Sequence, residues 1–319
     1  MRTRSAVQLV ANPRAGNGKG LALAERLQAS LRASGREART LVVRDSLEAR
    51  AWVKGCRGDF GYLLCVGGDS TLSEIAPLAL RHQVPLVPVP VGFGNIFART
   101  FGHRARIPSV LDLLDRGEVR WVDVGVERDG FFLSNRGVGF LEEVKQAVET
   151  RAALPHSGLL RYLAYVRTAL EMINSAPLPS IRVEVDGAPI AEEAVMAIVA
   201  NVPTYRGFLT FTPTTTPFDG LLDAFVVPPM TKRALVSLLL AFLFRLPGRW
   251  QRVSYRRGKR VSLTVRGHRA EELGVLPSSL PILTPPGPRF TPTPRATKGV
   301  VNRPLRLFAR TVPAALSPR

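Results

Sequence analysis

Short apolar runs alternate with amphipathic stretches along the first hundred residues. The apolar runs have the length of buried strands and predict β-strands at residues 7–11, 40–43, 62–66 and 85–91. Apolar residues at helical spacing predict helices at residues 21–34, 47–53 and 72–81, and a further helix from Ile96 onward. Because strands and helices alternate, we predict parallel β-α-β units with right-handed crossovers.

The pattern changes after one more predicted helix, at residues 107–116. From there, apolar runs predict strands at residues 122–126, 131–135, 181–185, 194–200, 222–227 and 261–265, with one helix at 159–173. Longer turns separate these strands, as is typical of an antiparallel sandwich or barrel. The predicted fold class is therefore an α/β domain with a parallel sheet, followed by an antiparallel β-sandwich domain, with the boundary near Val124.

Length and composition suit this division. The chain has 319 residues, 45% hydrophobic and 22% charged, which excludes a largely disordered protein and fits two domains. We divide it into residues 1–124, residues 125–290, and a basic, proline-rich tail at 291–319 that we expect to be disordered. Two cysteines are too few for a disulfide framework, which favours a reducing, cytoplasmic compartment.

The most apolar run, residues 234–246, is shorter than a bilayer span, which needs roughly 20 residues. It predicts a buried or interfacial helix, and a membrane-touching surface is the alternative.

The formal charge of +19 is concentrated towards the C-terminus. Residues 251–319 hold 14 of the 44 lysines and arginines but only two acidic residues, Glu271 and Glu272. Residues 277–318 also hold 10 of the 26 prolines, a density that argues against packed helix or central strand. The charge suggests an anionic partner. A low aromatic content (7%) and the lack of a recognised module argue against nucleic acid.

Three glycine-containing loops follow predicted strands, at residues 12–20, 67–71 and 92–95. In a parallel sheet the carboxyl ends of strands meet at one edge, where ligands collect. Glycine-loop N–H groups and the positive end of the next helix suit a phosphate, whereas each loop alone also fits an ordinary turn or helix cap. Neither a Walker A loop nor a G-x-G-x-x-G fingerprint is present. The candidate nucleotide-binding residues are Asn12, Pro13, Gly16, Gly67, Gly68, Asp69, Ser70, Thr71, Gly92, Gly94 and Asn95.

These motifs resemble those of the diacylglycerol kinase catalytic-domain superfamily, which includes sphingosine and bacterial lipid kinases. Residues 12–16 resemble its N-P-x-S-G segment, residues 67–71 its G-G-D-G-T segment, and residues 90–99 its P-x-G-T-x-N-D-x-A-R segment. Residues 219–223 are similar to its D-G-x-L-D segment. The likeness covers about residues 5–230.

The resemblance implies a Rossmann-like, NAD-kinase-like sheet domain, a C-terminal β-sandwich, and ATP with Mg²⁺ in the cleft between them. It implies transfer of the ATP γ-phosphate to a lipid hydroxyl, diacylglycerol- or sphingosine-like. Asp69 would act near the phosphates and the metal, and Asp219 and Asp223 would hold a second, structural Mg²⁺. The Asp219-Gly220 dipeptide also fits a hairpin turn, so two interpretations stay open there.

The chain departs from the family at several positions. Ser70, Phe93 and Ile96 replace a Gly, a Thr and an Asp, and a side chain at Ser70 is expected to narrow the approach of the backbone to phosphate. The D-G-E segment, whose Asp is the family's supposed base, does not occur in residues 265–272. The candidate replacements for this base are Glu271, Glu272 and His268.

Two hypotheses concern the C-terminal segment. The joint loss of D-G-E, acidic residues and periodicity after about Arg266 suggests an out-of-frame translation, and a basic membrane tether is the alternative. The predicted function is an ATP- and Mg²⁺-dependent lipid kinase, cytoplasmic and peripherally membrane-associated. We expect a lipid substrate at the membrane surface and no nucleic-acid partner, and leave a homodimer open. The alternative function is a catalytically impaired relative that binds nucleotide or lipid.

Overall fold

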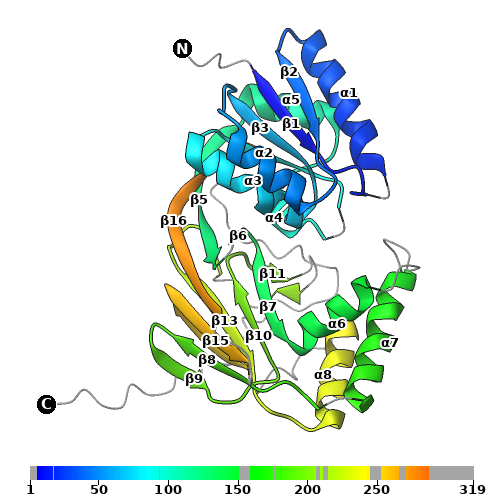
Figure 1. Ribbon diagram of the computed structural model, residues 1–319, viewed down its shortest axis with the longest axis vertical. Coiled ribbons are helices and arrows are strands. Elements are labelled where there is room, and N and C mark those ends of the chain that lie inside the picture. Colours follow the sequence, from blue (N-terminus) through cyan, green and yellow to red (C-terminus); the bar gives the residue numbers. More distant parts are fainter. Residues whose placement is uncertain are drawn as a thin grey trace, which may run out of the picture.

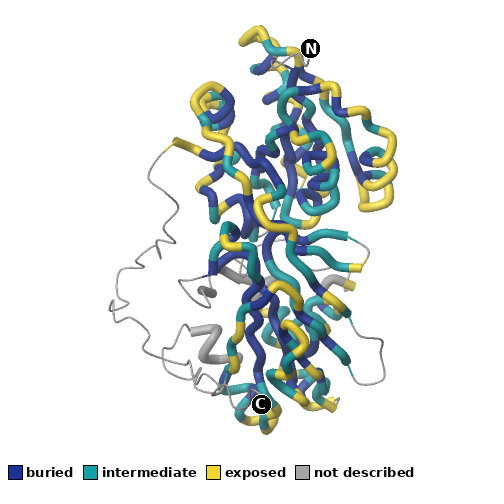
Figure 2. The backbone as a smooth tube through the Cα atoms, turned by 90° about the vertical axis from the view of Figure 1, so that its left-hand side faces the viewer, coloured by how far each residue is buried: buried dark blue, intermediate teal, exposed yellow. Residues whose placement is uncertain are grey.

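The computed structural model describes residues 6–16, 18–92, 94–128, 130–150, 159–175, 177–205, 209–210, 215–244, 253–265 and 271–286 (Figure 1). The chain forms two lobes, one above the other in that view. Figure 2 shows that buried backbone runs through the middle of both lobes, with exposed segments around it.

The first lobe is a parallel sheet between two layers of helices. Its strands lie in the order β2-β1-β3-β4, with bounds β1 (Val7–Ala11), β2 (Ala38–Val42), β3 (Tyr62–Gly67) and β4 (Leu86–Pro90). The helices are α1 (Lys19–Ala33), α2 (Ser46–Gly55), α3 (Asp69–His82), α4 (Ile96–Thr100) and α5 (Ile107–Arg116). Successive residues of a strand point to opposite faces, and two separate apolar cores result. One core packs α2, α3 and α4, the other α1 and α5, which confirms the predicted α/β domain.

The second lobe packs two antiparallel sheets face to face. One sheet has the order β14-β13-β10-β7, with bounds β7 (Asn135–Gly139), β10 (Met196–Ala200), β13 (Leu222–Val227) and β14 (Ser254–Gly258). The facing strands are β8 (Ile181–Val185), β9 (Ala188–Ala191), β15 (Arg260–Val265) and β16 (Glu271–Thr284). Apolar residues of both sheets form the core between them, which confirms the predicted sandwich. A short pair, β11 (Thr204–Tyr205) and β12 (Leu209–Thr210), lies apart from both sheets.

Three helices of the second lobe lie together on one side in Figure 1 and share a core with the start of β10 and the end of β13. They are α6 (Phe140–Glu149), α7 (Leu159–Ser175) and α8 (Lys232–Phe244). In α8, Leu235 and Leu238 are buried, which agrees with the predicted apolar helix there. Within the described residues no helix combines the length and the apolar character that a membrane crossing needs.

Two long strands join the lobes. They are β5 (Glu118–Glu127), which begins a hairpin with β6 (Gly130–Phe132), and β16. Along its length β16 pairs first with β15, then with β5, and finally in parallel with β4 (Figure 1). The sheet of the first lobe therefore continues into the second lobe, and β5 spans the boundary expected at Val124.

The strand β16 corrects the hypothesis that the natural fold ends near Arg266. Residues 271–284 form a paired strand with a buried end, although Pro277 and Pro281 lie within it. The strand tolerates them because its register with β5 shifts between Leu276 and Leu280, where Ser278 adopts a positive φ of 43°. The expectation that the prolines exclude a packed strand is therefore wrong for residues 277–284. The tail at 291–319 lies outside the described residues.

The predicted strand at 131–135 corresponds to two strands in different sheets. β6 pairs with β5, whereas β7 pairs with β10, and Leu133 and Ser134 form the crossing between them. The helix α6 follows immediately at Phe140 and was not predicted. The apolar residues Phe131 to Leu133 predict a strand, but the local pattern does not show that the chain passes to the other sheet after Ser134.

Candidate active site

The three glycine loops contact one another at the carboxyl edge of the parallel sheet. A Cβ added to Gly92 would lie 2.7 Å from Gly68 Cα, so the second and third loops touch backbone to backbone. A Cβ added to Gly16 would lie 2.4 Å from the carbonyl oxygen of Val91, so the first loop touches the third. Gly16 also has a positive φ of 62°, which favours glycine. The predicted loops therefore form one structure, which we name the cradle (residues 12–20, 67–71 and 91–95).

Asp69 connects the second and third loops. It is the first residue of α3, and its two carboxylate oxygens accept the backbone N–H groups of Ile96 at 2.9 Å and Phe97 at 3.0 Å. Burial raises the pKa of this carboxyl, and the two backbone bonds and Arg99 oppose the rise. Asp69 therefore holds the N-terminus of α4 against that of α3, in addition to any role towards a ligand.

Asn95 contributes a buried polar atom to the cradle. Its backbone is left-handed, with φ 46°, and its Nδ2 donates to the carbonyl oxygen of Gly92 at 2.5 Å. Its Oδ1 is buried without a hydrogen-bond partner among the described residues. Buried polar atoms are nearly always satisfied, so this oxygen suits a hydrogen-bond donor on a bound ligand.

The remaining predicted cradle residues support this structure. The Nδ2 of Asn12 donates to the Thr71 hydroxyl at 3.2 Å, which links the first and second loops. Ser70 is exposed in the first turn of α3, and its backbone is not left-handed. The second and third loops approach each other at Gly68, two residues earlier. Pro13 is half-buried in the first loop, Gly94 has a positive φ of 89°, and Phe93 lies outside the described residues.

The cradle fits a nucleotide with its magnesium ion. The first N–H groups of α3 have no helical partner and no side-chain cap, and they follow Gly67 and Gly68, an arrangement that suits a phosphate. Among the described residues no three His, Cys, Asp or Glu side chains gather into a metal site. A single carboxylate, Asp69, nevertheless suits Mg²⁺, which commonly binds one or two carboxylates together with substrate phosphates. Asp69 is the residue that would hold it.

The structure places Asp219 and Asp223 together, in the second lobe, with Arg257 beside both. Arg257 forms ion pairs with Asp219 and with Asp223, where its Nε lies 3.2 Å from Oδ1. Asp219 also accepts the N–H of Leu221 at 3.1 Å, as a tight turn would. Both carboxylates therefore already have a cationic partner in Arg257, and their predicted role in holding a second Mg²⁺ stays a prediction.

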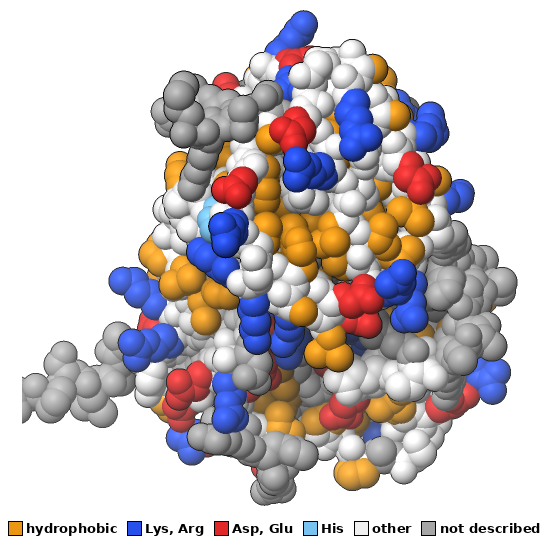
Figure 3. Space-filling model, turned by 45° about the horizontal axis from the view of Figure 1, so that its top comes forward, with side chains coloured by type: hydrophobic (Ala, Val, Ile, Leu, Met, Phe, Trp, Pro, Cys, Tyr) orange, Lys and Arg blue, Asp and Glu red, His pale blue; other side chains and the backbone are white. Residues whose placement is uncertain are grey.

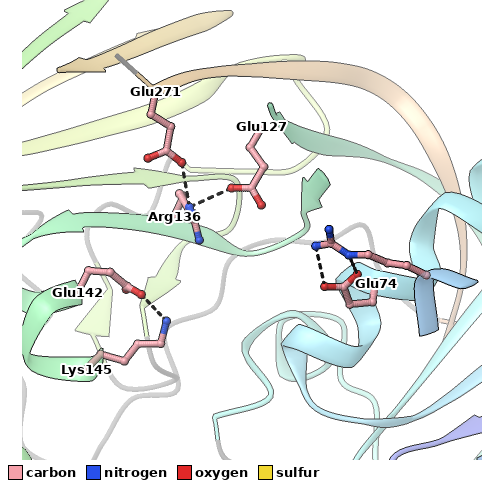
Figure 4. Close-up of polar contacts among 7 residues, drawn as sticks. Glu74, Glu127, Arg136, Glu142, Lys145 and Glu271 are labelled. Atoms are coloured by element: carbon pink, nitrogen blue, oxygen red, sulfur yellow. Dashed lines mark hydrogen bonds and ion pairs between the residues drawn. The ribbon is translucent and has the colours of Figure 1, made fainter. Parts of the chain in front are cut away.

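The two candidate bases lie on opposite faces of β16. Glu272 is exposed, whereas Glu271 faces Arg136 of β7, whose Nε lies 3.2 Å from Glu271 Oε1. The same Nε lies 3.0 Å from Oε2 of Glu127, at the end of β5. Figure 4 shows Glu127, Arg136 and Glu271 pointing toward one another, with Glu74 of α3 nearby. His268 lies outside the described residues.

This cluster (Glu127, Arg136 and Glu271) lies where the lobes meet. Burial raises the pKa of Glu127, Arg136 opposes the rise, and Glu271 adds to it. Arg50 and Glu74 of the first lobe also shift this pKa, which places Glu127 close to α3. Sequence reasoning missed Glu127 and Arg136, because neither belongs to a motif and the contact between Arg136 and Glu271 spans more than a hundred residues.

On the face drawn in Figure 3, lysines and arginines are interspersed with acidic side chains.

Comparisons with known proteins cover nearly the whole chain. The diacylglycerol kinase catalytic domain matches residues 6–126, and the YegS C-terminal NAD kinase beta sandwich-like domain matches residues 138–287. A protein named diacylglycerol kinase from Mycobacterium tuberculosis is 26% identical over 302 residues, 88% of this chain and 95% of that relative. An uncharacterised protein from Synechocystis is 25% identical over 247 residues, and the match spans 55% of its length.

A solved structure from Bacillus anthracis, assigned to the diacylglycerol kinases, has the same fold. Its TM-score is 0.68 at 21% identity, over 90% of this chain and 97% of that chain. The match of the second family model to residue 287 includes β16, which is a further finding against an out-of-frame segment from Arg266.

Proposed function

This chain belongs to the diacylglycerol kinase family, and from that premise we propose that it transfers the γ-phosphoryl group of ATP to a lipid hydroxyl. The acceptor class is a diacylglycerol- or sphingosine-like lipid. The observation that supports the nucleotide half of the proposal is the cradle. Its glycines touch, the N-terminus of α3 has no side-chain cap, and the Oδ1 of Asn95 has no partner among the described residues.

Phosphoryl transfer depends on positioning and charge neutralisation more than on covalent chemistry. The N–H groups at Gly68 and the start of α3 bind and orient the phosphates, and Asn95 Oδ1 accepts a hydrogen bond from a ribose hydroxyl or base amino group. Bound Mg²⁺ supplies neutralisation of the charge on the phosphates. Asp69 would hold this ion, and through Ile96 and Phe97 it keeps the second and third loops at a fixed separation.

The acceptor hydroxyl needs a proton acceptor, and Glu127 is our proposal for it. Glu74, which acts on the pKa of Glu127, lies five residues along α3 from Asp69, a rise of about 7.5 Å. Glu127 therefore lies within electrostatic range of α3, the helix that begins at the cradle. Its raised pKa improves it as a base, and Arg136 keeps it oriented between the lobes. Glu271 shares Arg136 and supports that orientation rather than receiving the proton.

A lipid acceptor implies contact with a membrane surface, and peripheral membrane association is part of the proposal. The described residues include exposed leucines on α7, Leu163 at 51% and Leu170 at 38%, which suit shallow contact with lipid.

The test is a direct phosphorylation assay. The protein is incubated with Mg²⁺, ATP labelled on its γ-phosphate, and mixed micelles that contain diacylglycerol or sphingosine, and labelled lipid is then extracted. The wild type is expected to label one of these lipids, and Asp69→Asn to reduce the rate at least 10-fold while circular dichroism stays unchanged. Asp112→Asn, at an exposed carboxylate of α5, is the matched control. Binding of ATP without labelling of any lipid would contradict the proposal.

A further inference from the structure

The guanidinium of Arg257 lies between the two carboxylates that the family resemblance marks for a structural metal. Its Nη2 pairs with Asp219, and its Nε lies 3.2 Å from Asp223 Oδ1. Asp223 is fully buried, and the Tyr255 hydroxyl donates to the same oxygen. Burial raises the pKa of the Asp223 carboxyl, and the Tyr255 hydroxyl and Arg257 lower it again. A buried carboxylate needs a partner of opposite charge, and here the protein supplies one.

The strand register makes this contact a fixed feature of the fold. Asp223 of β13 is directly opposite Arg257 of β14 in the antiparallel ladder, so their side chains lie on the same face. Asp219 lies just before β13, where the Arg257 side chain can reach it. The neighbouring Arg256 is exposed, as alternation along a strand requires.

Magnesium would have to compete with this guanidinium. The ion needs oxygen ligands in nearly octahedral geometry and retains several waters, and a second cation beside Arg257 would be repelled. We propose that Arg257 is the built-in counter-ion of Asp219 and Asp223, and that this site functions without a metal. Without the guanidinium, Oδ2 of Asp219 and the carboxylate of Asp223 would be available to a divalent cation.

The site adjoins the connection between the lobes. Gly220, the residue after Asp219, donates its N–H to Asp123 Oδ2 at 2.7 Å, and the other oxygen of Asp123 accepts the N–H of Ser278 in β16 at 2.7 Å. Arg257 therefore neutralises the loop that Asp123 ties to β16. The connection between the lobes then needs no ion, and the magnesium requirement of the protein is confined to the nucleotide.

The test measures the unfolding temperature, Tm, of the full chain without nucleotide, in EDTA and in millimolar MgCl₂. The wild type is expected to have the same Tm in both. Arg257→Ala is expected to lower Tm in EDTA by roughly 5 °C or more, and Mg²⁺ to restore part of the loss. The rescue is expected to disappear in the double variant Asp219→Asn, Arg257→Ala. Arg256→Ala, one position along the same strand, is the matched control and is expected to behave as wild type.

A second measurement covers the case in which Arg257→Ala does not fold. Binding of Mn²⁺ to folded wild type and to Asp219→Asn is followed by water proton relaxation, and the two are expected to agree. A wild-type Tm that rises in Mg²⁺, or Mn²⁺ binding that Asp219→Asn removes, would overturn the proposal. An Arg257→Ala variant as stable as wild type in EDTA, or one that Mg²⁺ does not rescue, would overturn it as well. None of these outcomes depends on kinase activity.

Discussion

Replacing Gly68 with alanine tests nucleotide binding by the cradle independently of the stability of the fold. A Cβ at Gly68 would lie 3.5 Å from Gly92 Cα and 3.9 Å from Asn95 Oδ1, both ordinary contacts. The backbone of Gly68 is extended, with φ −105°, which alanine adopts without strain. We therefore expect Gly68→Ala to change the free energy of unfolding by less than about 0.5 kcal/mol.

The added methyl group lies where a phosphate would approach the start of α3. The loss of one hydrogen bond between a backbone N–H and a charged phosphate is worth about 1.5–3 kcal/mol, which corresponds to roughly 10- to 100-fold weaker ATP binding. Isothermal titration calorimetry with ATP and Mg²⁺ measures the affinity, and urea unfolding measures the stability.

Alanine substitutions at two other glycines serve as controls for this result. A Cβ at Gly55, at the end of α2, would meet nothing within 4 Å. Gly55→Ala is therefore expected to change neither the affinity for ATP nor the free energy of unfolding. A Cβ at Gly92 would lie 2.7 Å from Gly68 Cα, so Gly92→Ala must push the loops apart and is expected to cost about 1–3 kcal/mol of stability. If Gly68→Ala binds ATP as tightly as Gly55→Ala does, the cradle is not the phosphate site and the reasoning fails.

Three other predictions concern proton and hydrogen-bond chemistry. Burial lowers the pKa of His103 to about 3, so its contribution to stability is complete above about pH 6.5, the usual value, and is lost as the pH falls towards 3. His103→Leu should therefore lose about 2 kcal/mol less stability between pH 7 and pH 5 than wild type does, as urea unfolding at both pH values would show. If Glu127 is the base, Glu127→Gln should lower kcat at least 100-fold and remove the acidic limb of the pH profile, whereas the exposed Glu272→Gln should change neither. An unchanged profile in Glu127→Gln would exclude that role. Asp123→Asn places an amide group against one of two N–H donors and should cost about 2–3 kcal/mol in chemical unfolding, in contrast to the exposed Asp112→Asn.

The sequence was sufficient for the parts of the fold that repeat a local pattern. The buried strands β1, β3 and β4 are apolar runs between glycine loops, and the cradle follows from the rule that such loops meet at one edge of a parallel sheet. The strand β16 was not predictable in this way, because its two prolines and mixed polarity hide a strand whose partners come from both lobes. The contacts Arg257–Asp219 and Arg136–Glu271 likewise depend on pairing between distant segments, which no local periodicity records.

The continuity of the sheet has a consequence for the proposed reaction. The cradle lies at the end of β3 and β4, Glu127 lies at the end of β5, and β16 pairs with both β4 and β5. Backbone hydrogen bonds of one sheet therefore set the distance between the phosphate-binding loops and the proposed base. Asp123 strengthens this connection at the irregular point of β16, where its carboxylate accepts the N–H of Ser278. Positioning errors of about 1 Å reduce catalysis strongly, so a lipid kinase built this way gains from a fixed sheet rather than a flexible linker between its lobes. Substitutions in β16 that leave every nucleotide contact intact should then lower kcat while the affinity for ATP stays constant.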